Sequence, residues 1–479
     1  MQSRRDQVQA YFFVVGRLVA AVVHGRPDVL QQPNRRLNTG TFLGVVVAAV
    51  LMGVFGIYGL FVPGGNNSWR QPGAVVMNEA TGARYVFLDG RLRPVLNYSS
   101  ARLAAGRSGD GRIHSVAQSS LSGTPVGQPI GIPGGPDALP ASDALDTGPW
   151  AVCAHPPEAG QPNPVAVTVL IGQGAERALT DRQALLVRGP DRVDHLVWRG
   201  KRHRLPGRTE VEALGYGGAG PTAVTAAWLN PLPQGRDLAV PETPGTGQPG
   251  PVIDGRRSVV GQVYRVGNPA LGTDQLYLVR GDGVAPLTRT GAALLLTAPF
   301  TGRAYPGASA RPVEVGPAAL TGVPVSGSGP DLAADLPPEP PELVQPSPEA
   351  LACAHFTPGG TGQSGVAVGL LPAAVVTAKA VPVAAHVAGT TADRVSVPAG
   401  RGVLLRDRSG AGVVHLVTET GVRYPLADTA AVSALGYSEQ AAVPVDAGLL
   451  ALLPPGPLLS TEGALRTRST DDETAPGPS

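Results

Sequence analysis

The chain of 479 residues is poor in lysine, cysteine and aromatic side chains. Lysine occurs only at Lys201 and Lys379, and neither precedes Ser or Thr, so the G-x-x-x-x-G-K-[ST] phosphate loop of many NTP-hydrolysing proteins is absent. Aromatic residues make up 5% of the chain and are not interleaved with basic residues, as a base-stacking surface would require. With a formal net charge of only +2, the composition also argues against nucleic acid as a partner.

Recognisable catalytic signatures are missing as well. The histidines show no H-E-x-x-H spacing, and no serine lies in a G-x-S-x-G turn. Three G-x-G-x-x-G matches begin at Gly215, Gly245 and Gly360, but none has the order of strand, glycine turn and helix that dinucleotide binding requires. The sequence therefore indicates no catalytic, cofactor-binding or metal-binding residues, and it leans away from an enzyme.

Glycine and proline, in contrast, are abundant. The chain has 64 glycines and 49 prolines, whereas charged residues are only 15%. This composition favours many short strands joined by turns over long helical bundles. We expect a β-rich α+β body.

One apolar run stands apart from this pattern, from Thr41 to Val62. It carries no charged side chain and, as a helix, would be about 33 Å long, enough to cross a hydrocarbon core of about 30 Å. Arginines precede the run and neutral residues follow it, which predicts a cytoplasmic N-terminus and an exported body. Forty residues before a full-length span do not fit a cleaved signal peptide. The alternative is a buried core helix of a soluble protein.

The residues before this run have helical periodicity. Apolar residues recur at Val8, Tyr11, Val15, Leu18 and Val22, with Arg4, Arg5, Asp6 and Arg17 off that stripe. Such a helix either lies on the membrane surface without a specific partner or packs on a cytoplasmic protein.

The two cysteines lie in matching contexts. Cys153 is in W-A-V-C-A-H and Cys353 is in L-A-C-A-H, and each motif is followed by a polar loop and an apolar run. In an exported body the simplest interpretation is one disulfide between Cys153 and Cys353. Two alternatives remain open: a Cys2His2 zinc site that includes His155 and His355, or two unlinked thiols.

The matching contexts belong to a longer internal repeat. His195-Leu196-Val197 leads to Pro206 and Ala-Leu-Gly-Tyr ending at Tyr216, and the same order recurs from His415 to Tyr437. Shorter relatives begin near Tyr85 and Leu276. Each unit predicts two strands, a turn and a short helix, with Thr209 and Glu212 as a capping box and Gly215 as the helix stop. The paired positions of His195 and His415 favour a structural role over a catalytic one.

A basic turn runs from Arg199 to Arg204. It is either a solvated hairpin tip or a contact for an anionic wall polymer.

These patterns divide the chain into segments. We assign a cytoplasmic amphipathic helix (1–40), a transmembrane helix (41–62), a linker (63–83), repeat module 1 with a loop (84–149), the first half of a central β domain (150–192), repeat module 2 (193–240), a linker (241–252), repeat module 3 (253–321), a proline-rich linker (322–350), the second half of the central β domain (351–400), repeat module 4 (401–460) and a disordered tail (461–479).

Taken together, the chain resembles EccB, the membrane core component of the actinobacterial type VII (ESX) secretion system. The resemblance covers nearly the whole chain and is carried by S-R-R-x-Q-V from Ser3, W-A-V-C from Trp150 and the two A-L-G-Y motifs. It implies four repeat modules around a disulfide-bridged central β domain.

The resemblance also implies a function and partners. The expected protein is a single-pass subunit of the inner membrane whose extracytoplasmic body assembles with further copies, with EccC, EccD and EccE, and with a mycosin protease nearby. Members of the family are sometimes labelled ATPases, a label that no motif in this chain supports. The alternatives are a membrane-anchored cell-wall-binding module and an exported hydrolase.

Overall fold

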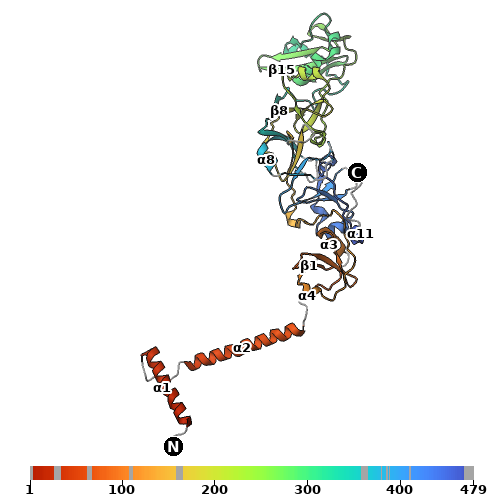
Figure 1. Ribbon diagram of the computed structural model, residues 1–479. Coiled ribbons are helices and arrows are strands. Elements are labelled where there is room, and N and C mark those ends of the chain that lie inside the picture. The colour runs from red at the N-terminus through yellow and green to blue at the C-terminus, as the bar shows by residue number, and fades with distance from the viewer. Residues whose placement is uncertain are drawn as a thin grey trace. The chain divides into compact units, whose positions relative to one another are not determined.

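The computed structural model describes residues 4–25, 34–61, 67–106, 112–157, 165–357, 365–378, 380–383, 387, 389–408 and 412–468. The chain divides into two compact units, which Figure 1 colours along the sequence. The N-terminal unit comprises residues 1–69, 78–82 and 115–124, and the second unit comprises the remainder.

Two long helices dominate the N-terminal unit. They are α1 (Arg4–His24) and α2 (Asn34–Phe61). Within the described residues α2 alone is long and apolar enough to cross a membrane, over Leu37–Tyr58, and that stretch is fully exposed. The helix that contains the predicted span begins at Asn34, and its long apolar stretch begins at Leu37, four residues before the predicted start at residue 41. Residues 26–33 and 62–66 of the predicted N-terminal segments lie outside the described residues.

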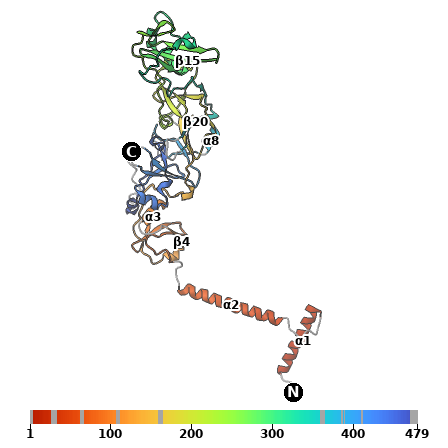
Figure 2. The ribbon, with the colours of Figure 1, turned by 180° about the vertical axis from the view of Figure 1, so that it is seen from behind.

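The remaining chain forms mainly β-structure, which Figure 2 shows from behind. Four small sheets share one order of four strands, with the third strand of the sequence at one edge and the fourth beside the first, and the second sheet has a fifth strand that also pairs with β8. In three of them the fourth strand runs parallel to the first. The first sheet contains β1 (Val75–Asn78), β2 (Arg84–Leu88), β3 (Arg91–Pro94) and β4 (Ile113–Val116); the second, β8 (Gln183–Arg188), β9 (Asp194–Trp198), β10 (Lys201–Leu205) and β11 (Thr222–Ala223); the third, β14 (Val263–Asn268), β15 (Thr273–Arg280), β16 (Gly283–Leu287) and β17 (Val313–Val315); the fourth, β23 (Val403–Asp407), β24 (Val414–Val417), β25 (Arg423–Pro425) and β26 (Val443–Val445).

A short helix follows the third strand of every one of these sheets. The helices are α3 (Tyr98–Ala105), α5 (Arg208–Ala213), α7 (Arg289–Thr297) and α9 (Thr429–Ala434). Side-chain oxygens cap three of them, on Asn97, Thr288 and Asp428, each accepting from the amide three residues on. The predicted capping box of α5 is wrong. Its N-cap is Gly207, which has no side chain to accept this hydrogen bond, and Glu212 instead pairs with Arg208.

The predicted helix stop at Gly215 is confirmed. Gly215 has φ +82° and Gly436 has φ +92°, a conformation that a side chain disfavours. In both places the amide of the following tyrosine donates to a carbonyl five residues back, Tyr216 to Val211 at 2.9 Å and Tyr437 to Val432 at 3.1 Å.

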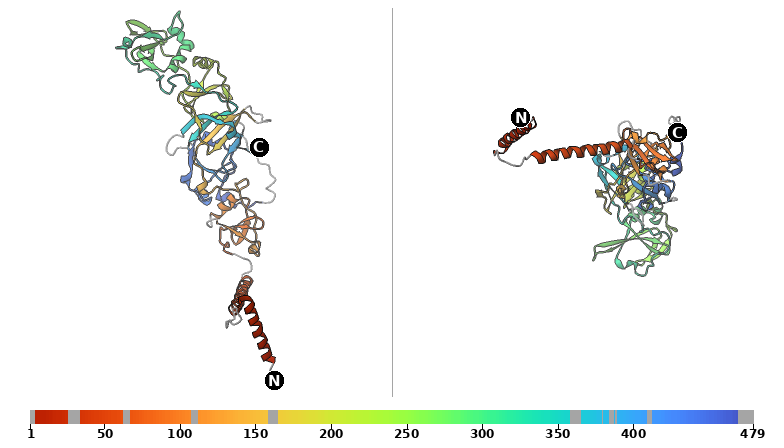
Figure 3. Two further views of the ribbon diagram at one scale, coloured as in Figure 1. Left: turned by 90° about the vertical axis from the view of Figure 1, so that its left-hand side faces the viewer. Right: turned by 90° about the horizontal axis from the view of Figure 1, so that it is seen from below.

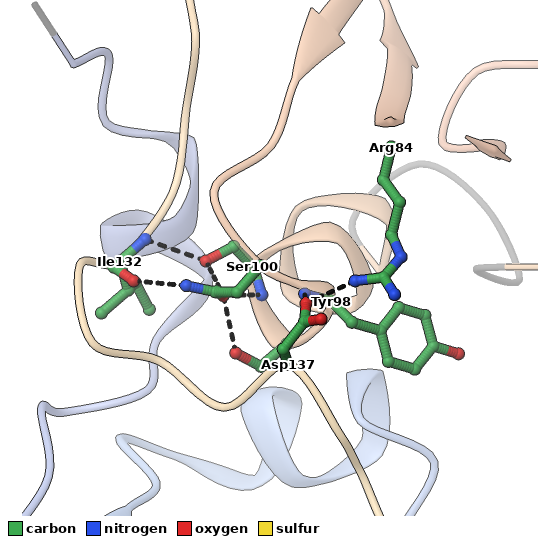
Figure 4. A network of polar contacts seen from close by, with 7 residues as sticks. Arg84, Tyr98, Ser100, Ile132 and Asp137 are labelled. Carbon is green, nitrogen blue, oxygen red and sulfur yellow. Dashed lines mark hydrogen bonds and ion pairs between the residues drawn. The ribbon is translucent and has the colours of Figure 1, made fainter. Parts of the chain in front are cut away.

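The segments after these helices are hydrogen-bonded to their sheets, including those that the sequence assigns to the loop of module 1 (84–149) and to the proline-rich linker (322–350). Each one runs beside the third strand of its sheet, as in the bonds from Leu92 to Pro125 O and from Leu238 to Arg204 O. Figure 4 shows how one such segment binds α3: Ser100 Oγ accepts from Ile132 N at 2.8 Å, and Asp137 Oδ1 accepts from Tyr98 N at 2.9 Å and pairs with Arg84. The edge that β3 would otherwise expose is satisfied by the bonds from Leu92 N to Pro125 O and from Gly127 N to Leu92 O.

Several predicted boundaries differ from the structure because segments predicted as linkers contribute strands to the sheets. Strand β1 lies within the predicted linker 63–83, and β8 joins the second sheet although it lies in the predicted central segment 150–192. The proline-rich segment 322–350 contains β18 (Glu342–Leu343), which pairs with β8. Within the predicted disordered tail 461–479, residues Thr461–Leu465 form the helix α11, which buries Ala464 completely. Residues 469–479 lie outside the described residues.

A seven-stranded sheet lies in the second unit, and Figure 3 gives two further views of the chain. Its order is β21-β22-β6-β5-β19-β20-β7. The strands are β5 (Trp150–His155), β6 (Ala166–Ile171), β7 (Arg177–Ala178), β19 (Ala350–Thr357), β20 (Gly365–Pro372), β21 (Val381–Pro382) and β22 (Arg394–Ser396). Outside the sheets described so far, β12 (Pro249–Ile253) pairs with β13 (Arg256–Val259), and the remaining short helices are α4 (Gln118–Leu121), α6 (Ala226–Leu229), α8 (Ala373–Ala378), α10 (Ala447–Leu450), η1 (Ser142–Ala144), η2 (Pro299–Ala304), η3 (Pro317–Leu320) and η4 (Glu439–Ala441).

Three large cores connect these sheets. One face of the seven-stranded sheet shares a core with the second and fourth sheets, through residues such as Val187 and Leu405. The opposite face of the second sheet, with Leu186, packs on the third sheet, and the first sheet packs on the fourth. Because β8 and β23 are buried on both faces over part of their length, they contain the apolar runs Ala184–Val187 and Val403–Leu405.

Two buried tyrosines hydrogen-bond to the segments that precede strands β5 and β19 of the seven-stranded sheet. Tyr437 donates its hydroxyl to Pro140 O at 2.7 Å, and Tyr216 donates to Pro341 O at 2.7 Å. Pro140 precedes β5 and Pro341 precedes β19, so the two bonds occupy corresponding places. Burial raises the pKa of both phenols, which keeps them protonated donors.

We predict that Tyr437→Phe and Tyr216→Phe each lower the unfolding free energy by about 1–2 kcal/mol, because a buried carbonyl loses its donor. Denaturant unfolding followed by circular dichroism measures the change. Tyr277→Phe is the matched control, since its hydroxyl donates to exposed Gln275, and its effect should stay below about 0.5 kcal/mol. Equal losses for all three variants would contradict the assignment.

Candidate functional site

The centre of the seven-stranded sheet is the pairing of β5 with β19. The strands run antiparallel, and Cys153 lies directly opposite Cys353. The two residues form a disulfide across a sequence separation of 200 residues, and both are fully buried. Closing a loop of this length stabilises a fold by roughly 5 kcal/mol on the chain-entropy view.

Alternation along β5 and β19 places the disulfide on one face of the sheet. Cys153 and Cys353 share that face with Leu170, Leu371 and Val376, the last of which comes from α8. Ala154, Ala352 and Ala354, which are next to the cysteines in sequence, face the opposite way, whereas Ala151 lies on the face of the disulfide.

The opposite face of the sheet carries the large residues. Trp150, Val152 and Phe356 enter the core shared with the second and fourth sheets. The indole of Trp228, on α6, is fully buried there and donates to Val152 O at 3.0 Å. This bond ties the second sheet's segment to the strand that holds Cys153.

His155 and His355 lie two residues after the cysteines and are both buried. The His155 ring is satisfied: Nδ1 is 2.8 Å from Pro156 O, which can only accept, and Nε2 is 2.9 Å from Thr168 Oγ1. The His355 ring is 2% exposed, and neither of its nitrogens has a partner in the described part of the chain. Desolvation lowers the pKa of His355 to about 4, so the ring is neutral at pH 7.

The zinc alternative requires free thiols, whereas the two sulfurs are bonded to each other. Across the described residues there is also no group of three or more His, Cys, Asp or Glu side chains with the geometry of a metal site. What the four residues form in the structure is a buried disulfide with a buried histidine two residues further along each strand.

The repeat histidines are buried in their own sheets. His195 on β9 and His415 on β24 each have a buried Nδ1 without a hydrogen-bond partner among the described residues. Desolvation is the main cause that lowers the pKa of both rings. His203 is also buried and bonds to Arg236 O at 2.8 Å. His386, Gly360 and Gly362 lie outside the described residues.

The turn from Arg199 to Arg204 is not a free hairpin tip. Gly200 is buried, and a β-carbon there would lie 2.0 Å from Val366 O on β20. The tip of the β9–β10 hairpin therefore packs against the seven-stranded sheet, a contact that only glycine permits. Gly421, beyond β24, approaches Val395 on β22 in the same way. Sequence reasoning missed both contacts, although the glycines at the two turns were the available signal.

Comparison with protein families gives one match. Residues 1–471 match the family described as "Type VII secretion system ESX-1, transport TM domain B".

Curated relatives are similar over nearly their full length. The chain is 32% identical to a protein named ESX-3 secretion system ATPase EccB3 from Mycolicibacterium smegmatis, with 96% of this chain and 90% of the relative aligned. It is 30% identical to the protein of the same name from Mycobacterium tuberculosis, over 97% of this chain and 90% of the relative.

Two solved structures are similar in fold. A chain in the structure of an intact ESX-5 inner membrane complex aligns with a TM-score of 0.69 and 27% identity, over 98% of this chain and 96% of that one. The structure of the EccB3 dimer from the ESX-3 core complex aligns with a TM-score of 0.68 and 29% identity, over 82% of this chain and 100% of that one.

We predict that acid weakens the fold partly through His355. Because its pKa is lowered from 6.5 to about 4 in the fold, the unfolded chain binds the proton more readily, so stability is lost as the pH falls from about 6.5 toward 4. The loss attributable to this ring is at most about 3 kcal/mol.

The variant His355→Leu removes the titrating ring and should flatten this region of the pH profile. It should not destabilise the protein at pH 8, since it replaces two buried nitrogens that lack partners. Thermal melts of both proteins from pH 8 to 5 measure the difference. A slope identical to that of the wild type would contradict the prediction.

Proposed function

The chain belongs to the EccB family of type VII secretion membrane proteins, and from this premise we propose that it is a structural core subunit of an ESX inner-membrane secretion complex. The observation that carries this proposal is the likeness, over nearly its whole length, to a chain of an intact ESX-5 inner membrane complex. A scaffold role also suits a chain whose sequence carries no catalytic signature.

The proposed topology is a single crossing by α2. Arginines on the N-terminal side of the span support a cytoplasmic N-terminus, which places the β-rich body on the extracytoplasmic side. The disulfide between Cys153 and Cys353 supports the same side, because such bonds persist in oxidising compartments. A further similar structure, 27% identical to this chain, is described as the periplasmic assembly from the ESX-5 inner membrane complex.

The proposed architecture is four repeat modules around a central β domain. It is supported by the common strand order of the four small sheets and by the matching bonds of Tyr216 and Tyr437. The proposed modules begin at their first strands, so the second includes β8. The two cysteines then join the two halves of the repeated pattern at the strands β5 and β19.

We further propose that the body assembles with other copies of itself and with EccC, EccD and EccE, near a mycosin protease. The description of a similar structure as the EccB3 dimer supports self-association. The named subunits follow from the family resemblance. In the membrane, the fully exposed apolar surface of Leu37–Tyr58 would be covered by lipid or by helices of these subunits.

The curated relatives carry the word ATPase in their names. We favour the scaffold because the sequence lacks the glycine-rich loop and lysine with which many ATPases hold phosphates. The second candidate that the sequence left open is a membrane-anchored cell-wall-binding module. The detergent-extracted chain used to test the scaffold can also test this candidate.

We predict that the tagged full-length chain, expressed in its own host and extracted with mild detergent, co-purifies with other type VII membrane subunits in stoichiometric amounts. A variant with two arginines within the span, Val47→Arg and Val54→Arg, is the control. It should lose membrane insertion and the subunits together, because charge at the centre of a span is costly.

Quantitative mass spectrometry of the eluates measures the outcome. Recovery of the wild-type chain alone would contradict the scaffold. Sedimentation of the extracted chain with purified cell wall would instead favour the second candidate, and ATP turnover lost on a single substitution would favour an enzyme.

A further inference from the structure

A hollow of about 340 Å³ lies on the second sheet, where β8, β9 and the start of α5 meet. Three guanidinium groups line it, from Arg188, Arg192 and Arg208, together with the carboxylate of Asp194. Pro206 and Val211 form part of its apolar wall. Neither the scaffold role nor the contacts of the central sheet account for this concentration of arginine.

The three arginines differ in how they are engaged. Arg188 is bound to Asp194 through two bonds, Nε to Oδ1 at 2.7 Å and Nη2 to Oδ2 at 2.9 Å, so this pair is electrically balanced. Arg208 holds Glu212 at 2.7 Å in an exposed pair, which contributes little stability and is readily exchanged. The Arg192 side chain has no ion pair or hydrogen bond within the described part of the chain.

The fourth sheet provides an internal comparison for this hollow. His195 pairs with Val187 as His415 pairs with Leu405, so the strands of the two sheets can be aligned position by position. The helices align from their closing glycines, Gly215 and Gly436. By this alignment the second sheet has Arg192, Gly207 and Arg208 where the fourth sheet has Gly412, Asp428 and Thr429.

Arg192 holds a backbone conformation that suits glycine. Its φ is +62°, and Gly412 in the fourth sheet has φ +73°. A residue with a side chain costs about 1 kcal/mol or more in this conformation, and such strain concentrates at functional sites. The second sheet thus contains a backbone strain at Arg192 that the fourth sheet avoids with Gly412, and Arg192 is one of the residues that line the hollow.

Gly207 is unusual for the opposite reason. Its φ of −155° is extended backbone that any residue adopts, so the turn itself does not require glycine. At the corresponding position Asp428 supplies a carboxylate, which accepts from Ala431 N at 2.7 Å. Arginines line the hollow beside Gly207, and the second sheet has no side chain at that position. Glu210 reaches back toward it, with Oε2 3.1 Å from where a β-carbon of residue 207 would lie.

We propose that this hollow binds the carboxylate of an organic ligand about the size of an amino-acid derivative, such as an acidic side chain or a peptide terminus of a partner. Arg192 and Arg208 hold the carboxylate, with Arg208 exchanging Glu212 for the ligand. The apolar wall at Pro206 and Val211 contacts the remainder of the ligand. Phosphate shares the chemistry of the two arginines, but the aspartate of the fourth sheet and the apolar wall favour a carboxylate.

The test is equilibrium dialysis of the full-length chain in detergent with radiolabelled N-acetyl-leucine. We expect saturable binding at one site per chain in the millimolar range. N-acetyl-leucinamide, which has the same shape without the charge, should bind at least tenfold more weakly. Equal binding of the two compounds, or no saturable binding of N-acetyl-leucine, would overturn the proposal. Stronger binding of inorganic phosphate than of N-acetyl-leucine would also overturn it.

Variants taken from the fourth sheet locate the site. The double variant Arg192→Gly with Arg208→Thr should bind at least tenfold more weakly, and Gly207→Asp should abolish binding by supplying its own carboxylate. Arg466→Thr is the matched control, because Arg466 and Glu462 form a similar exposed pair elsewhere, and it should bind as the wild type does.

Thermal melts check that each variant folds, and Gly207→Asp alone decides the matter if the double variant does not fold. Undiminished binding by the folded variants would overturn the assignment to this hollow. This result is independent of whether the chain co-purifies with secretion subunits.

Discussion

The pairing of β5 with β19 is the interaction on which the second unit depends. It brings together strands 200 residues apart in the sequence, in the middle of a seven-stranded sheet. The disulfide joins the two strands at the directly opposite residues Cys153 and Cys353. One face of this sheet forms the core that the second and fourth sheets share. The third sheet packs on the second and the first on the fourth, so the outer two are linked to the central sheet through the second and fourth.

The shared strand order of the four small sheets shows how a chain poor in aromatic residues builds a large β-rich body. Each small sheet has too few strands to bury both faces alone, and the structure pairs the sheets so that β8 and β23 are covered on both sides. The segments after the helices then close the exposed strand edges, and Tyr216 and Tyr437 fix the points at which these segments turn toward the central strands. Where the repeat is broken, as at Arg192 and Gly207, packing gives no reason for the change, which is why a binding role is inferred there.

Much of this organisation follows from the sequence. The matching cysteine contexts predicted one bond between Cys153 and Cys353, and the structure has it; the closing glycine of α5 was also predictable, because only one residue type suits its φ. The predicted linkers 63–83 and 322–350 contain the paired strands β1 and β18, because glycine and proline content does not show which backbone amides pair with a strand. The capping box failed because Thr209 lies two residues after the N-cap, Gly207. The buried turn at Gly200 depends on Val366, 166 residues away in the sequence, which no local pattern reports.

The most direct test of how far the second unit depends on the β5–β19 pairing removes the disulfide and measures hydrogen exchange in the two strands. In the double variant Cys153→Ala with Cys353→Ala, hydrogen exchange followed by mass spectrometry should show faster exchange in β5 and β19, while the β14–β15 hairpin stays protected. We expect a loss of roughly 3–5 kcal/mol of local stability in the central strands. Unchanged protection of β5 and β19, with protection lost elsewhere, would show that the body does not depend on this pairing.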